Sequence, residues 1–293
     1  MFKGSIAALV TPFKNGKIDE AKLKELVQFH IKNGTNAIVP CGTTGESPTL
    51  SQDEHERVIT VCIEAAAEKI PVLAGTGSNS TAEAVSLTKH AARAGADGVL
   101  VVSPYYNKPT QKGLYEHYKV LSECSDIPII VYNIVGRTAV NITPETMAKL
   151  AHDFKNIIGV KEASGSLEQM AQVKHLCPKD FILLSGDDSL TLPLLSIGGK
   201  GVISVVANIV PKDVLSLVES FEKGNLRKAQ ELHYKLLPLV KAMFLETNPI
   251  PLKTAMGLMG LCSGDMRLPL CSMSDDNLAK LKKALRDYGL LKG

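Results

Sequence analysis

The sequence has little of what nucleic-acid binding or membrane insertion requires. Only 5% of its 293 residues are aromatic, none is tryptophan, and the 33 basic and 30 acidic residues form no block of one sign. The net charge of +3 leaves no electrostatic footprint for a nucleic acid, so we expect no such partner. No run of about 18 apolar residues is present, so we expect no membrane span. The chain begins in a strand pattern without a signal peptide, which favours a cytoplasmic location.

The sequence also lacks a metal-binding cysteine pattern. The six cysteines form no CxxC pair and no cysteine–histidine spacing typical of zinc sites. We therefore interpret them as small core or subsite residues of a protein in a reducing cytoplasm, and the cysteines predict no metal site.

An alternation of short apolar runs with longer amphipathic segments is repeated eight times. The apolar runs, rich in Val, Ile and Leu, are typical of strands buried on both faces; they lie at residues 5–10, 36–41, 71–75, 98–102, 128–133, 157–162, 181–185 and 201–206. Helix starts are marked by a capping box from Ser51 to Glu54 and by Thr143 before Pro144. Eight such units predict an α/β fold, a TIM (β/α)8 barrel. An open doubly wound sheet would need a glycine-rich phosphate turn after the first strand, and residues 11–16 do not provide one.

The chain continues beyond what a barrel needs. We predict a barrel over residues 1–224 and a helical extension over residues 225–293, with helices near 226–241, 249–260 and 275–288. The added helices should cover apolar surface or form a subunit interface.

Lys161 ends one of the apolar runs, where a charged amine is costly. Burying an unpaired ammonium costs several kcal/mol, so a lysine there either reaches solvent with its tip or is held neutral. A neutral amine is a nucleophile toward carbonyl groups, and its pKa would have to fall from about 10.4 toward about 7–8. Alternation along strands places Tyr132 on the equivalent face of the neighbouring strand, and Gly159 below Lys161 should leave room for its stem.

The remaining polar segments also follow strand ends, where barrel active sites lie. Residues 42–47 read Gly-Thr-Thr-Gly-Glu-Ser, which suits a carboxylate ligand or else a turn with positive φ at Gly42 and Gly45. Arg137 is either a carboxylate clamp or a surface ion pair. Asp187 and Asp188 are most simply read as helix caps.

Together these segments resemble the dihydrodipicolinate synthase family of class I aldolases, in the superfamily of N-acetylneuraminate lyase, and the resemblance spans nearly the whole chain. It implies condensation of pyruvate with L-aspartate 4-semialdehyde through a Schiff base on Lys161, for lysine and diaminopimelate biosynthesis. It also implies a lyase that uses no cofactor and no metal. It also assigns roles by position. The catalytic set is Lys161, Tyr132, Thr43 and Tyr106, and the substrate-binding set is Thr44, Arg137, Ile203 and Gly186.

Arg137 bears on the choice between branches of that superfamily. The resemblance implies that the synthase branch uses this arginine for the semialdehyde carboxylate, whereas an N-acetylneuraminate lyase or a 2-keto-3-deoxy sugar-acid aldolase, which keeps the same Schiff base, lacks it. Val135 stands where the family usually has proline, and this frees φ and loosens how Arg137 is presented. A barrel kept only as a binding protein is a third interpretation; it would be expected to have lost these residues, and all are present.

The resemblance further implies two kinds of partner. L-lysine would be a feedback inhibitor at positions matching Ser47, His55, Asn79, Glu83 and Tyr105, although His55 is equally typical of a solvated helix residue. A homotetramer, a dimer of dimers, follows if Tyr106 serves a neighbouring subunit.

Overall fold

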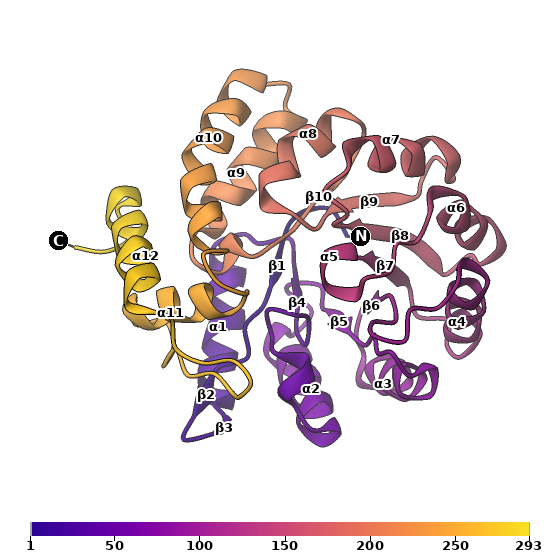
Figure 1. Cartoon of the computed structure of the whole chain (residues 1–293), viewed down its shortest axis with the longest axis horizontal. Helices are drawn as coiled ribbons and strands as arrows, with labels where there is room; N and C mark the ends of the chain where they lie inside the picture. The colour runs from indigo at the N-terminus through magenta and orange to yellow at the C-terminus, as the bar shows by residue number, and fades with distance from the viewer. Residues whose placement is uncertain (1, 293) are drawn as a thin grey trace.

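The computed structural model describes residues 2–292, and eight parallel strands form its centre (Figure 1). The strand order is β4-β1-β10-β9-β8-β7-β6-β5, and an isolated bridge between Ile38 and Val72 closes the ring. The strands are β1 (Gly4–Ala8), β4 (Ala37–Val39), β5 (Leu73–Gly75), β6 (Gly98–Val102), β7 (Ile129–Asn133), β8 (Ile157–Glu162), β9 (Ile182–Ser185) and β10 (Gly201–Ser204). The predicted TIM barrel is confirmed, with all eight strands within or close to the expected ranges.

Helices surround this barrel and follow its strands in order. They are α1 (Glu20–Lys32), α2 (Gln52–Ala66), α3 (Thr81–Ala94), α4 (Gln111–Glu123), α5 (Val135–Thr138), α6 (Pro144–Asp153), α7 (Leu167–Leu176), α8 (Thr191–Ser196) and α9 (Pro211–Glu222), with short 3-10 turns η1 (Ser47–Thr49), η2 (Asp188–Leu190) and η3 (Val206–Asn208). The predicted capping box is present, because Ser51 Oγ accepts from Glu54 N at 3.2 Å and Glu54 Oε2 accepts from Ser51 N at 3.0 Å.

Two apolar layers result from this arrangement. One lies inside the barrel, where Ile6, Val39, Leu73, Leu184 and Ile203 belong to one cluster of buried side chains. The larger layer lies between the strands and the surrounding helices. Parallel strands buried on both faces need this double cover, which is why their sequences are apolar without alternation.

The extension consists of α10 (Leu226–Ala242), α11 (Ile250–Leu258) and α12 (Asp275–Tyr288). Figure 1 shows these helices on one side of the barrel, with α10 along α9 and α12 beyond it. Leu236, Leu252 and Leu281 belong to the same apolar layer as the barrel helices. The three predicted helices are confirmed, whereas a domain boundary at residue 224 stays a prediction.

A small hairpin, β2 (Phe13–Lys14) with β3 (Lys17–Ile18), was not expected from the sequence. Among residues 2–292 there is no helix with the length and apolar character that crossing a bilayer demands.

Candidate active site

Lys161 lies at the carboxyl end of β8 and is only 6% exposed. Burial lowers the pKa of its amine to about 8, against the opposing effect of the carboxylates of Asp187 and Asp188, while Arg137 lowers it further. The pKa therefore falls in the range that the sequence argument required. At neutral pH a useful fraction of the amine is uncharged and nucleophilic.

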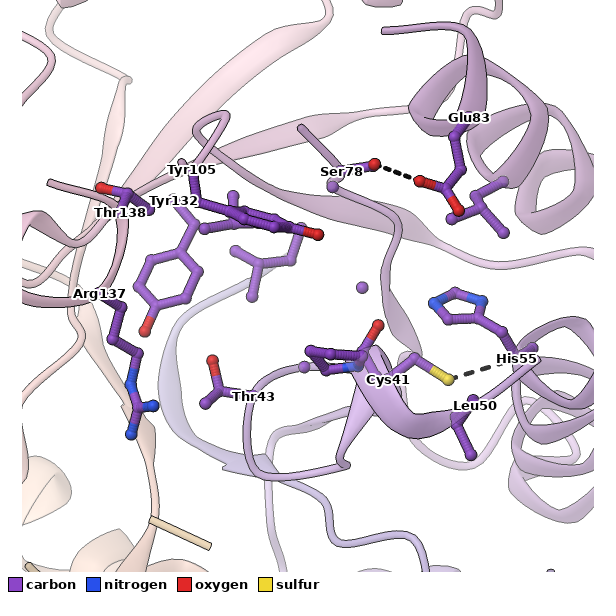
Figure 2. A pocket seen from close by; sticks show the side chains of 18 of the residues that line it. Cys41, Thr43, Leu50, His55, Ser78, Glu83, Tyr105, Tyr132, Arg137 and Thr138 are labelled. Carbon is purple, nitrogen blue, oxygen red and sulfur yellow. Dashed lines mark hydrogen bonds between the residues drawn. The ribbon is translucent and has the colours of Figure 1, made fainter. Parts of the chain in front are cut away.

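Tyr132 is the neighbour of that amine. It pairs in register with Lys161 across β7 and β8, and Lys161 Nζ lies 4.1 Å from the centroid of its ring. Burial raises the pKa of the Tyr132 phenol above its ordinary value, so the hydroxyl keeps its proton at neutral pH. Figure 2 shows the Tyr132 and Thr43 hydroxyls facing each other, and Thr43 lowers the pKa of the phenol slightly against the effect of burial.

The prediction that Gly159 makes room for the lysine stem is wrong. A Cβ on Gly159 would lie 2.6 Å from the carbonyl oxygen of Ile182, so this glycine allows the close approach of β9. Gly186 is the residue that leaves space for the lysine, because a Cβ there would lie 3.2 Å from Lys161 Cε and 2.6 Å from Ala163 Cβ. The structure thus places Gly186 directly against the reactive side chain.

The interpretation of residues 42–47 as a turn with positive φ at both glycines is also wrong. The positive φ angles fall at Cys41 (55°), just before the segment, and at Glu46 (54°), within it. Gly45 is required for a different reason, since a Cβ would lie 3.1 Å from both Cys41 N and Leu9 O. The tightly packed segment presents Thr43 to the cavity and buries Thr44.

The side chain of Asp188 does not cap the helical turn in which it lies, contrary to the simplest reading of the sequence. Its carboxylate accepts from Val205 N at 2.9 Å and Val206 N at 3.3 Å, at the end of β10. Burial raises the pKa of Asp188, while these backbone donors and Lys161 act in the opposite direction. Asp187 precedes η2 without a side-chain cap hydrogen bond.

Arg137 extends from the short helix α5, which Val135 begins. Its Nη2 donates to the backbone oxygen of Asn248 at 3.1 Å, and it forms no ion pair among residues 2–292. The ion-pair alternative is therefore excluded, and the guanidinium keeps donors for a ligand carboxylate.

A cavity of about 400 Å³ joins several predicted residues (Figure 2). Its lining includes Thr43, Tyr132 and Arg137 together with the predicted inhibitor positions Ser47, His55, Glu83 and Tyr105. Lys161, Thr44, Gly186, Ile203 and Asn79 lie outside its lining; Ile203 is buried in the barrel interior with Tyr132. No group of three or more metal-ligating side chains occurs in the described part of the chain.

Tyr106 is not brought to the other catalytic positions. Its side chain is 89% exposed, and its backbone has φ 73°, which is unusual for a residue with a side chain. Within one chain it contributes nothing to the cavity that Thr43 and Tyr132 line.

The structure adds functional candidates that the sequence argument missed. Asn248 Nδ2 donates to Thr44 Oγ1 at 3.0 Å, and Lys253 Nζ lies 2.5 Å from Glu46 Oε1 in an ion pair whose side chains are fully buried. These partners are more than 200 residues apart in sequence. One signal was available, because Lys253 is a charged residue inside the otherwise apolar helix α11.

Comparisons with known proteins agree with this geometry. Residues 1–288 match the profile of the Dihydrodipicolinate synthetase family. The 4-hydroxy-tetrahydrodipicolinate synthases of Endomicrobium trichonymphae and Syntrophus aciditrophicus are 63% and 61% identical; the matches cover 100% and 99% of this chain and 100% of each relative.

Solved structures give the same relationship. The dihydrodipicolinate synthase of Aquifex aeolicus is 52% identical with a TM-score of 0.98, and the match covers 100% of both chains. The enzyme of Cyanidioschyzon merolae, solved with lysine bound, is 43% identical with a TM-score of 0.97, and 99% of each chain is covered. The chain therefore belongs to the dihydrodipicolinate synthetase family.

Proposed function

We propose that this chain condenses pyruvate with L-aspartate 4-semialdehyde to give 4-hydroxy-tetrahydrodipicolinate, through a Schiff base on Lys161. The observation that carries the proposal is the buried amine of Lys161, with its pKa lowered to about 8, against the ring of Tyr132. Family membership over nearly the whole chain supports the substrates, because the curated relatives are 4-hydroxy-tetrahydrodipicolinate synthases.

The chemistry begins at the uncharged amine. Lys161 Nζ attacks the C2 carbonyl of pyruvate, and water leaves to give an iminium ion. The iminium withdraws electrons from the methyl carbon, which loses a proton to become an enamine. That carbon attacks the aldehyde carbon of the semialdehyde, whose oxygen takes up a proton. The amino group of the adduct then displaces Lys161 as the ring closes.

A group that donates a proton in these steps must hold that proton at neutral pH, and it accepts a proton only after passing its own to a relay. Tyr132 meets this condition, because burial raises its pKa, and its hydroxyl faces that of Thr43. We assign Tyr132 as the group that gives and takes protons at the pyruvate-derived carbon and oxygen, with Thr43 as its relay. Thr44 is assigned to the pyruvate carboxylate, and Gly186 and the backbone of Ile203 to the pyruvate pocket.

Arg137 is assigned to the carboxylate of the second substrate. It is held by Asn248 O and has no carboxylate partner of its own within residues 2–292. This assignment separates the proposal from a sugar-acid aldolase with the same Schiff base. Condensation should be fast with L-aspartate 4-semialdehyde and slow with sugar aldehydes at equal concentration. Comparable rates with both would reject the assignment.

The function is tested by measuring product formation from the two substrates with the wild-type chain and Lys161→Ala. The wild type should form product and the variant should lose at least about three orders of magnitude in rate, because the covalent route is closed. Lys174→Ala is the matched control, since Lys174 lies on α7 and its Nζ donates to the backbone oxygens of Lys179 and Phe181 in the segment before β9. Undiminished turnover by Lys161→Ala would refute the mechanism.

Tyr106 supports a further part of the proposal, that two copies of the chain complete each other's sites in a homotetramer. A tyrosine that is 89% exposed at the catalytic end of the barrel, on a backbone with positive φ, suits insertion into a neighbouring copy. Among the similar solved structures is one described as a monomeric dihydrodipicolinate synthase variant, so the assembly has to be measured. Sedimentation should give a tetramer, and Tyr106→Phe should lower kcat while the tetramer persists. A fully active monomer would contradict this part.

We also propose inhibition by L-lysine at one end of the cavity. Ser47, His55, Glu83 and Tyr105 line it, and Asn79 follows the lining residue Ser78 in sequence; the backbone oxygen of Asn79 accepts from Asn107 Nδ2 at 2.9 Å. Burial lowers the pKa of His55 to about 4, so the ring is neutral, and both ring nitrogens lack a hydrogen-bond partner within residues 2–292. Glu83 supplies the anion for an ammonium. Lysine should lower the initial rate of the wild type and have a much weaker effect on Glu83→Gln. A flat response of the wild type to millimolar lysine rejects inhibition.

A further inference from the structure

The helical extension reaches into the active site through one residue, Asn248. Its side chain and backbone are buried, with 5% of the residue exposed. Nδ2 donates to Thr44 Oγ1 at 3.0 Å, and the backbone oxygen accepts from Arg137 Nη2 at 3.1 Å. Asn248 therefore touches the two groups assigned to the carboxylates of the two substrates.

The direction of the bond to Thr44 has a chemical consequence. A hydroxyl has one proton and two lone pairs, and the amide N–H of Asn248 occupies one lone pair. The Thr44 proton is then free to point at another acceptor. With the carboxamide reversed, Oδ1 would accept that proton and the hydroxyl would be lost as a donor. The structure orients the amide with its donor toward Thr44, and this leaves the buried Oδ1 without a hydrogen-bond partner among residues 2–292.

The segment around Asn248 is held rigidly enough to impose this geometry. Lys253, one turn further along, forms the buried pair with Glu46 and donates to Thr11 O at 2.9 Å. The backbone N–H of Arg267 donates to the second oxygen of Glu46 at 3.1 Å. Contacts from the extension thus hold both Thr44 and Glu46, two residues apart on the same active-site loop.

We propose that Asn248 is a positioning residue that directs the hydroxyl proton of Thr44 toward the carboxylate of pyruvate. The extension is then part of the catalytic unit, because it sets the donor that recognises the first substrate. This inference rests on the proposed pyruvate site at Thr44.

The test measures the pyruvate concentration that gives a half-maximal rate of reductive trapping on Lys161, with pyruvate as the only substrate and cyanoborohydride as reductant. Asn248→Ala should raise that concentration about fivefold, the equivalent of one hydrogen bond of about 1 kcal/mol, and leave the maximal trapping rate nearly unchanged. Asn248→Asp should raise it further, because a carboxylate accepts the Thr44 proton and repels the substrate anion. In the full reaction, KM for the semialdehyde should change less than twofold with Asn248→Ala, since the backbone contact to Arg137 remains.

A double-mutant cycle separates this role from general loosening of the structure. Thr44→Val should raise the half-saturating pyruvate concentration, and Asn248→Ala should add almost nothing in that background. Asn156→Ala is the control, because Asn156 Nδ2 makes two backbone hydrogen bonds, to Ser122 O and Ser125 O, at the opposite end of β8. It should leave the pyruvate dependence unchanged, both alone and in the Thr44→Val background.

Several results would overturn the inference while leaving the proposed function intact. These are a half-saturating concentration for Asn248→Ala within twofold of the wild type, additivity with Thr44→Val, or an equal effect of Asn156→Ala. Absence of any adduct in the wild type would instead end the proposed function, and with it the basis of this inference. Thermal unfolding of every variant shows that the comparison is made between folded proteins.

Discussion

The pKa of Lys161 makes a quantitative prediction about pH. A pKa lowered from 10.5 to about 8 leaves about 9% of the amine uncharged at pH 7, whereas the ordinary value would leave about 0.03%. The rate of Schiff-base formation at pH 7 should therefore be about 300 times that of an unperturbed lysine. A lowering of this size corresponds to about 3 kcal/mol, which burial of the amine supplies against two neighbouring carboxylates.

The assay follows the rate of pyruvate trapping on Lys161 by intact mass at limiting pyruvate, from pH 6 to pH 10. The rate should rise tenfold per pH unit below pH 7 and level off above about pH 8. Arg137→Gln should move the midpoint to higher pH, because the guanidinium helps to disfavour the ammonium, and Asp187→Asn should move it to lower pH.

Two results would refute this reasoning. One is a rate that still rises tenfold per unit between pH 9 and pH 10, which is the behaviour of a solvated lysine. The other is a midpoint that moves in the same direction in both variants, which would show that the charges near Lys161 do not set its pKa.

Three further predictions concern stability and the second substrate. Lys161→Met should raise the free energy of unfolding at pH 7 by about 1–3 kcal/mol, because the folded state disfavours the charged amine. This gain should shrink as the pH rises from about 8 toward 10.5, where the amine of the unfolded chain also loses its proton. Urea unfolding at several pH values measures the gain. Lys253→Met should cost about 3–5 kcal/mol in the same assay, because it leaves the carboxylate of Glu46 buried without its partner. The double variant with Glu46→Gln should recover much of that loss, and strictly additive losses would show that the two side chains are not coupled. Val135→Pro should raise the midpoint of thermal unfolding, because proline suits the first position of α5. It should also lower KM for the semialdehyde, because a more rigid α5 restricts the positions that Arg137 can adopt. An unchanged KM would show that Val135 does not loosen that arginine.

The barrel was predictable because its signal is local and repeated. Buried parallel strands need continuous apolar runs, and β6 and β8 have the bounds that those runs predict. Lys161 and Tyr132 were predictable for a related reason, since alternation along adjacent strands fixes which side chains share a face. The hairpin of β2 and β3 was missed because each strand has only two residues, too few for any periodic pattern.

Other features depended on contacts that sequence spacing does not contain. The glycines near Lys161 could not be sorted by sequence, because the clashes they avoid come from Ile182 and Ala163 on neighbouring segments. The role of Asp188 depends on backbone donors that follow β10. Asn248 lies 204 residues from Thr44, and nothing in its local sequence marks it. Lys253 could have been identified, because it is a lysine in a mainly apolar helix. As for Lys161, a lysine in an apolar segment indicates a buried amine that is paired or neutral.

The central claim is that the amine of Lys161 bonds covalently to the keto carbon of pyruvate. The most direct measurement incubates the chain with pyruvate and a hydride reductant and maps the modified peptide by mass spectrometry. The account predicts one pyruvate-derived adduct per chain, on Lys161, and none in Lys161→Ala. An adduct on another lysine, or an unmodified chain at saturating pyruvate, would contradict it.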